Sequence, residues 1–127
     1  MSTPLYRDPD ASIEERVENL LSLMTLDEKL AQLGCLWSTA FVSTGNFEPN
    51  AVAEMMSHGI GEITRIGATT TLAPRPRAVL ANAIQRYLVE ETRLGIPAII
   101  HEESTGGFCH RDPQRRTRDN DELLRFC

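Results

Sequence analysis

The sequence predicts an α/β fold, because two strand-like runs flank one long helical pattern. The run Ile60–Arg65, in which apolar and polar positions alternate imperfectly, predicts the first strand. Apolar residues then recur at helical spacing from residue 77 to about residue 94. The apolar run Ile96–Ile100 follows and predicts a buried strand, with Pro97 at its start, where a missing amide hydrogen is tolerated. Strand, helix and strand in this order predict a parallel pair joined by a crossover helix.

Two amphipathic helices are predicted before the first strand. Ser12 can cap the first helix, and acidic residues in its first turn suit the positive end of the helix dipole. Thr25 and Glu28 have the spacing of a capping box, so a second helix is predicted to begin there and to end at Gly34. The predicted buried faces consist of Ile13, Val17, Leu20, Leu21 and Met24 in the first helix and of Leu26, Leu30 and Leu33 in the second.

The segment between the second helix and the first strand carries turn-forming residues. Residues 38–49 contain Gly and Pro and are predicted to form a loop. Asn50 can cap a short helix that runs through Met56 and ends at Gly59.

A second connection, over residues 68–77, is predicted to be polar and irregular. Pro76 suits the first turn of the long helix, and Gly95 can end that helix. The face of the long helix predicted to pack on the sheet contains Val79, Leu80, Ala83, Ile84, Tyr87, Leu88 and Glu91.

Composition excludes several classes of protein. The chain has 127 residues and a formal net charge of −5, which makes nucleic-acid binding a poor fit because phosphate backbones require clustered Lys and Arg. No apolar run approaches the roughly 20 residues of a membrane span, so no membrane association is expected. The first ten residues lack a basic segment followed by an apolar run, so no secretory leader is expected and a cytoplasmic location is predicted.

The three cysteines are Cys35, Cys109 and Cys127. Their number and wide spacing fit neither a disulfide framework nor a CxxC metal site. We expect them to be buried or incidental thiols, and the sequence predicts no metal site and no cofactor.

Candidate binding residues follow the second predicted strand. His101, Glu102 and Glu103 come directly after the apolar run, and ligands of parallel α/β folds gather at the carboxyl ends of the strands. Charged carboxylates are strong hydrogen-bond acceptors and could hold the hydroxyl groups of a sugar. The small residues 104–107 would let the backbone approach a ligand. A solvated acidic loop is the alternative interpretation.

Several known catalytic motifs are incomplete in the chain. A zinc-protease helix would need a second His at Thr105, and a nucleophile elbow would need Gly at Glu102. A dinucleotide loop beginning at Gly59 would need its third glycine at Thr64. Cys109 and His110 are adjacent, a spacing that rarely lets a thiol and its base face each other.

Motifs over residues 5 to 112, in order, resemble the N-terminal domain of glycoside hydrolase family 3. The opening helices of that family end in a run Met-Thr-Leu-x-Glu-Lys, which is present here from Met24 to Lys29. The quoted matches are Tyr6–Asp8, Arg16–Leu33, Gly59–Ile63, Asn82–Gln85, Glu91–Pro97 and Ile99–Glu103.

The resemblance implies a (β/α)8 barrel enzyme that cleaves β-linked glucosides or xylosides with retention. It also implies that Glu103 holds sugar hydroxyls, with His101 and Glu102 beside it. The family's nucleophile and acid/base positions lie far downstream of the matched segment, so no catalytic residue is assigned within this chain. The family's usual His-Gly is replaced by Gly106-Gly107, which leaves the substrate open.

A full barrel of this type has roughly 250 residues and eight strands. Residues 1–112 are therefore expected to be an incomplete N-terminal portion of a barrel that is inactive alone and needs the remaining strands. The arginine-rich residues 113–127 depart from the family pattern and are predicted to be a disordered tail.

Two other interpretations stay open at this point. The amphipathic helices at 12–33 and 77–94 could instead form a non-enzymatic module that covers a protein partner; a strand at 96–100 would argue against it. A small zinc or thiol enzyme built on Cys109, His110, His101 and Glu103 is the third interpretation.

Overall fold

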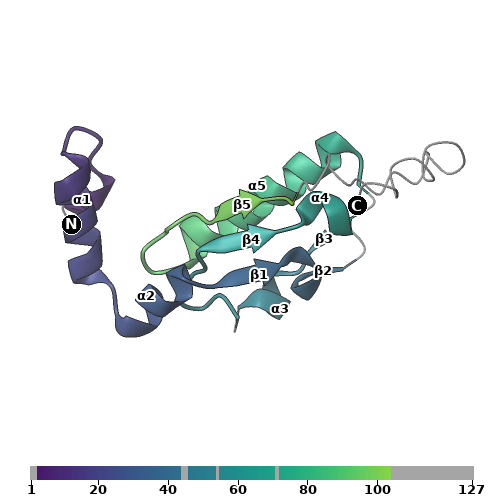
Figure 1. Ribbon diagram of the computed structural model, residues 1–127, viewed down its shortest axis with the longest axis horizontal. Coiled ribbons are helices and arrows are strands. Elements are labelled where there is room, and N and C mark those ends of the chain that lie inside the picture. The colour runs from purple at the N-terminus through teal and green to yellow at the C-terminus, as the bar shows by residue number, and fades with distance from the viewer. Residues whose placement is uncertain (1–2, 44–45, 54, 71, 104–127) are drawn as a thin grey trace, which may run out of the picture.

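The computed structural model describes residues 3–43, 46–53, 55–70 and 72–103. These residues form a mixed α/β structure with a three-stranded parallel sheet and a two-stranded antiparallel hairpin (Figure 1). The sheet has the order β1-β4-β5, with β1 at Cys35–Trp37, β4 at Glu62–Thr64 and β5 at Ile99–His101. The hairpin pairs β2 (Val42–Ser43) with β3 (Asn46–Phe47). The helices are η1 (Leu5–Arg7), α1 (Ile13–Leu23), α2 (Leu26–Gln32), η2 (Ser38–Ala40), α3 (Pro49–Val52), α4 (Ile66–Thr69) and α5 (Pro74–Glu91).

The predicted parallel pair is present, and a third strand joins it. β4 and β5 are parallel neighbours connected through α5, as the strand-helix-strand pattern predicts. β1, which the sequence pattern did not reveal, pairs with the other side of β4, so that Cys35 lies opposite Glu62 and Trp37 lies opposite Thr64. The three residues of β1 are all apolar and show no alternation of apolar and polar positions, so no strand pattern is visible there.

Two predicted connections contain regular structure. The expected loop 38–49 contains η2 and the two hairpin strands, and the expected connection 68–77 contains the end of α4 and the start of α5. The long helix begins at Pro74, and Pro76 lies in its first turn as expected. α3 begins at Pro49 and has no side-chain cap, so the predicted cap at Asn50 is wrong. Proline at the first helical position starts this helix instead, because its backbone angle is already helical.

Both predicted helix starts in the first third of the chain are confirmed. The Ser12 side chain accepts a hydrogen bond from the Glu15 amide, and the Glu15 carboxylate accepts one from the Ser12 amide. Thr25 and Glu28 make the same reciprocal pair at the start of α2. Each pair satisfies two backbone donors that a helix start leaves free.

The predicted burial of the apolar faces of α1 and α2 is wrong. Leu26, Leu30 and Leu33 are 71%, 56% and 85% exposed, and α1 has no buried residue. In Figure 1, α1 stands to one side of the sheet. Helical spacing shows that apolar residues share a face, but it does not show that another element covers that face. In the described part of the chain, no other element buries the apolar faces of α1 and α2.

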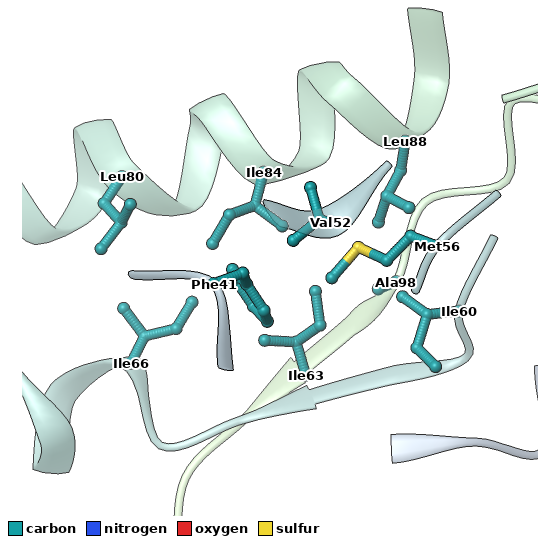
Figure 2. Close-up of a cluster of buried hydrophobic side chains, with 10 residues drawn as sticks. All are labelled: Phe41, Val52, Met56, Ile60, Ile63, Ile66, Leu80, Ile84, Leu88 and Ala98. Atoms are coloured by element: carbon teal, nitrogen blue, oxygen red, sulfur yellow. The ribbon is translucent and has the colours of Figure 1, made fainter. Parts of the chain in front are cut away.

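The hydrophobic core lies between α5 and one face of the sheet. Leu80, Ile84 and Leu88 point from α5 toward Ile63 and Ile66, and side chains from the segments before β4 fill the space between them (Figure 2). The three α5 residues follow the predicted helical spacing, whereas Val79, which the sequence assigned to the same face, is exposed. Leu36 and Ile100 pack against this core from the neighbouring strands.

Since successive side chains of a strand point to opposite faces, the other face of the sheet carries the remaining strand residues. These are Cys35, Trp37, Glu62, Thr64, Ile99 and His101. No helix in the described ranges covers this open face (Figure 1). Ile99 is accordingly exposed.

Polar contacts join the first residues of the chain to the turn between α5 and β5. The Tyr6 hydroxyl and the Arg7 guanidinium donate hydrogen bonds to the carbonyl oxygen of Leu94, at 2.7 and 3.1 Å. Arg93 donates to both carboxylate oxygens of Glu28, at 2.8 and 2.5 Å, and to the carbonyl oxygen of Leu23. These contacts position α1 and α2 although their apolar faces are not buried.

None of the described helices has both the length and the hydropathy needed to span a membrane.

Candidate functional site

The carboxyl ends of the three parallel strands lie side by side. Trp37, Thr64 and His101 occupy one row of the register and are the last residues of β1, β4 and β5. Because the strands run in the same direction, Arg65 and Glu102, which directly follow β4 and β5, extend beyond the same edge of the sheet. This edge is where ligands bind in parallel α/β folds.

Glu103 forms an ion pair with Arg65 across this edge. The Arg65 guanidinium also lies over the indole ring of Trp37, 4.5 Å from the ring centroid. Trp37 is 51% exposed and the Glu103 side chain is 56% exposed, so both keep surface that a ligand could reach. Residues from all three strand ends therefore form one cluster of a carboxylate, a guanidinium and an aromatic ring.

The backbone of Arg65 is held in a conformation that few residues other than glycine adopt. Its φ is 65°, in the left-handed region. Its carbonyl oxygen accepts hydrogen bonds from the Ser38 hydroxyl at 3.1 Å and from the Thr69 hydroxyl at 2.6 Å. The Thr69 amide donates to the same oxygen at 3.0 Å. Strained backbone of this kind persists where the surroundings fix it, and it is concentrated at functional sites.

Glu102 points away from Glu103 and has one unused oxygen. The amide of Gly67 in α4 donates a hydrogen bond to Oε1 of Glu102. Oε2 is buried and has no hydrogen-bond partner among the described residues. A buried carboxylate oxygen without a partner is energetically costly.

His101 makes its contacts on the open face of the sheet. Nε2 of its ring lies 3.8 Å from the Cys35 sulfur and 3.5 Å from Oε2 of Glu62. The three consecutive residues predicted to bind a sugar thus have three different sets of neighbours: Glu103 contacts Arg65, Glu102 contacts α4, and His101 contacts β1 and β4.

The sequence did not single out Trp37 and Arg65 at this edge, or Cys35 and Glu62 as neighbours of His101 on the open face. Arg65 is the last residue of the first predicted strand, so attention to the carboxyl end of that strand could have found it. Trp37 and Cys35 lie on β1, the strand that the sequence pattern did not reveal. Cys35 is exposed, so of the two expected alternatives, a buried or an incidental thiol, it is not the buried one. Cys109, His110, Gly106, Gly107 and the predicted tail 113–127 lie outside the described residues.

This arrangement suits a small ligand that carries hydroxyl groups on an apolar ring. Carboxylates accept hydrogen bonds from hydroxyl groups, and a guanidinium donates to oxygen atoms. The exposed part of the Trp37 ring offers a flat apolar surface next to these polar groups. A few convergent polar groups beside an aromatic surface are typical of small-molecule sites.

Comparison with known proteins gives one family. Residues 25–118 match the family description "Glycosyl hydrolase family 3 N terminal domain". A Formosa agariphila protein that is named as a beta-xylosidase is 35% identical over 106 residues, which cover 80% of this chain and 14% of that protein. A protein of Aspergillus oryzae named as a beta-glucosidase C is 32% identical over 114 residues, which cover 84% of this chain and 17% of that protein. A protein of Aspergillus flavus with the same name has the same identity and coverage. The chain thus spans 14% to 17% of the length of these relatives.

Proposed function

The chain belongs to glycosyl hydrolase family 3, and from this premise we propose that its sheet edge is part of the sugar-binding site of an enzyme that hydrolyses β-linked glucosides or xylosides. Glu103 is the proposed acceptor for sugar hydroxyl groups. Glu102 and His101 lie beside it, and we add Arg65 and Trp37 to the site. The observation that carries the proposal is the cluster of Glu103, Arg65 and Trp37 at the carboxyl edge of a parallel sheet.

The geometry supports a role in holding one ring of the substrate. The Arg65 guanidinium pairs with the Glu103 carboxylate, and the strained backbone of Arg65 is braced by Ser38 and Thr69. A sugar that binds beside Glu103 and Arg65 would lie against the exposed part of Trp37.

The larger architecture in which this edge would work is a (β/α)8 barrel. β4, α5 and β5 form a β–α–β unit of the type from which such barrels are built. In a complete barrel, the open face of the sheet would become the inside of the barrel. Hydrolysis with retention requires two carboxyl groups about 5 Å apart, one as nucleophile and one as acid/base. We propose that both come from parts of the enzyme outside residues 25–118, so that the 127-residue chain binds sugar but does not hydrolyse it.

The first test is hydrolysis of aryl β-xyloside and aryl β-glucoside by the purified 127-residue chain. We expect no activity above a mock purification. Turnover above that control which disappears in Glu103→Gln would contradict the proposal that the reacting carboxyl groups lie elsewhere.

The second test is sugar binding by the same chain. Saturation-transfer NMR with methyl β-xyloside and methyl β-glucoside should give a signal for at least one sugar, and Glu103→Gln and Trp37→Ala should each weaken it by about tenfold or more. Glu90→Gln is the matched control, because Glu90 is an exposed carboxylate on α5 that pairs only with Arg86 in the described part of the chain. Failure of both sugars to bind, or equal binding by the Glu103 and Glu90 variants, would overturn the proposed site.

A module made only of helices is a weaker explanation of the same sequence. Ile99–His101 forms a strand paired in parallel with β4, and a module made only of helices would not contain such a strand. The exposed faces of α1 and α2 do not distinguish the two functions, because an incomplete α/β domain would expose them as well.

A further inference from the structure

We propose that Cys35, Glu62 and His101 form a zinc site on the open face of the sheet. The sequence predicts no metal site, because these residues are far apart in the chain and do not form a short ligand motif. The structure brings them together from three neighbouring strands, and their ligand atoms all lie within 4.8 Å of one another. The inference does not depend on the proposed glycosidase function.

The strand register explains why the three side chains converge. Cys35 lies directly opposite Glu62 in the β1–β4 pair, so the two side chains share a face. His101 lies two residues beyond Ile99, which is the partner of Glu62 on β5, and residues two apart in a strand point to the same side. The imidazole ring extends back along the sheet toward both groups.

The distances between the three side chains are compatible with a shared metal ion. Nε2 of His101 is the common neighbour, 3.8 Å from Sγ of Cys35 and 3.5 Å from Oε2 of Glu62. A strong N–H···O bond is shorter, about 2.7 to 3.2 Å, and one ring nitrogen carries at most one hydrogen. With usual zinc–ligand bond lengths, two ligands of a tetrahedral ion lie about 3.6 Å apart for sulfur and nitrogen and about 3.4 Å apart for nitrogen and oxygen.

The chemistry of the donors selects the metal. A thiolate with an imidazole favours Zn²⁺ over Mg²⁺ or Ca²⁺, which prefer ligands made of oxygen alone. Cys35 is exposed, and the side chains of Glu62 and His101 are 49% and 37% exposed, so an ion can enter from the open face. Three protein ligands leave a fourth position for water or a ligand atom, as in zinc sites that are not purely structural.

The test is metal binding by the 127-residue chain after treatment with a chelator and dialysis. Titration with ZnCl₂ against a chromophoric chelator should show one equivalent of bound zinc. CoCl₂ should give the absorption of a thiolate–cobalt bond, and zinc should abolish it. Cys35→Ser and His101→Gln should each weaken zinc binding by at least about 100-fold, since even loss of an outer-shell partner costs 10- to 100-fold. Glu62→Gln should weaken it by at least about tenfold.

Two control variants separate this site from other ligands in the chain. His58→Gln removes a histidine that is not in the cluster, and Cys109→Ser combined with Cys127→Ser removes the thiols outside the described residues. Both should bind zinc as the unchanged chain does, and far-ultraviolet circular dichroism should show the same spectrum for every variant. The proposal is overturned if the unchanged chain binds no zinc at micromolar concentration. It is equally overturned if the double cysteine variant loses the metal while Cys35→Ser keeps it.

Discussion

Glu28 has two structural roles at once. Its carboxylate caps α2 through the Thr25 amide, and it accepts two hydrogen bonds from Arg93, 65 residues later in the chain. Its side chain is only 7% exposed. The bonds from Arg93 lower the pKa of Glu28 from 4.5 to about 2, although burial acts in the opposite direction. The sequence analysis assigned only the capping role, because no local pattern indicates a partner so distant in sequence.

The lowered pKa predicts how this contact responds to acid. A carboxyl group whose pKa is lower in the folded state adds stability above its unfolded pKa, and this stability is lost as the pH falls. At pH 7 we expect Glu28→Gln to reduce the free energy of unfolding by about 2 kcal/mol, because it removes charged hydrogen bonds. The difference between the two proteins should shrink as the pH falls from about 4.5 to about 2, measured by urea denaturation at each pH. A difference that stays constant with pH would contradict the assignment.

A substitution at Arg65 can distinguish the strain in its backbone from the function of its side chain. Asn tolerates the left-handed region, so Arg65→Asn should relieve strain of about 1 kcal/mol while losing an exposed ion pair and a cation–π contact of similar size. We expect the free energy of unfolding to change by less than about 1 kcal/mol and sugar binding to fall by about tenfold or more. Chemical denaturation and saturation-transfer NMR measure the two effects. Undiminished sugar binding would show that the guanidinium has no part in the site.

At the scale of the elements, the starts of α1 and α2 were predictable and β1 was not. Ser12 and Thr25 each act through a residue three positions later, so the information lies within one turn of the chain. β1 exists because its backbone pairs with β4, 27 residues away by the Cys35–Glu62 register. β1 depends on that distant partner and leaves little local pattern in the sequence.

The close approach of α2 to the segment before β4 requires glycine at position 61. A Cβ atom at this position would lie 1.9 Å from the carbonyl oxygen of Gln32, which belongs to the backbone and cannot rotate away. Gly61→Ala should therefore reduce the free energy of unfolding by about 3 kcal/mol. Gly34→Ala is the control, because its Cβ would lie 3.1 Å from the end of the Ile60 side chain and 3.2 Å from the Ala31 carbonyl oxygen, so only a small shift is needed, and it should cost about 1 kcal/mol. Equal effects in urea denaturation would contradict the close approach.

For the whole molecule, the same substitution should have different effects in the core and on α2. Leu88 is fully buried between α5 and the sheet, whereas Leu30 on α2 is 56% exposed. Leu88→Ala should lower the free energy of unfolding by about 3 kcal/mol through lost burial and an unfilled cavity. Leu30→Ala should change it by less than about 1 kcal/mol. Thermal and urea denaturation of both variants measure the contrast. A cost near 3 kcal/mol for Leu30→Ala would mean that another surface covers α2 in solution.

The α/β class and the residues after β5 could be read from the sequence, because they depend on patterns within each element. Which residues come together at the site could not be predicted in this way. Arg65, Trp37 and Glu103 come together only through the order β1-β4-β5, which is a property of the whole sheet. The burial of α1 and α2 was mispredicted for the same reason, since whether a face is covered depends on elements elsewhere in the chain.

Trp37 is the single tryptophan of the sequence. Excited at wavelengths that tyrosine does not absorb, the protein therefore has one fluorescent group, and this group lies beneath the Arg65 guanidinium at the edge of the sheet. Any molecule that displaces that guanidinium changes the solvent exposure of the indole, and this changes the wavelength and intensity of its fluorescence. The protein thus carries a built-in optical reporter, and arrival of a ligand at this edge could be followed on the millisecond timescale without attaching a dye.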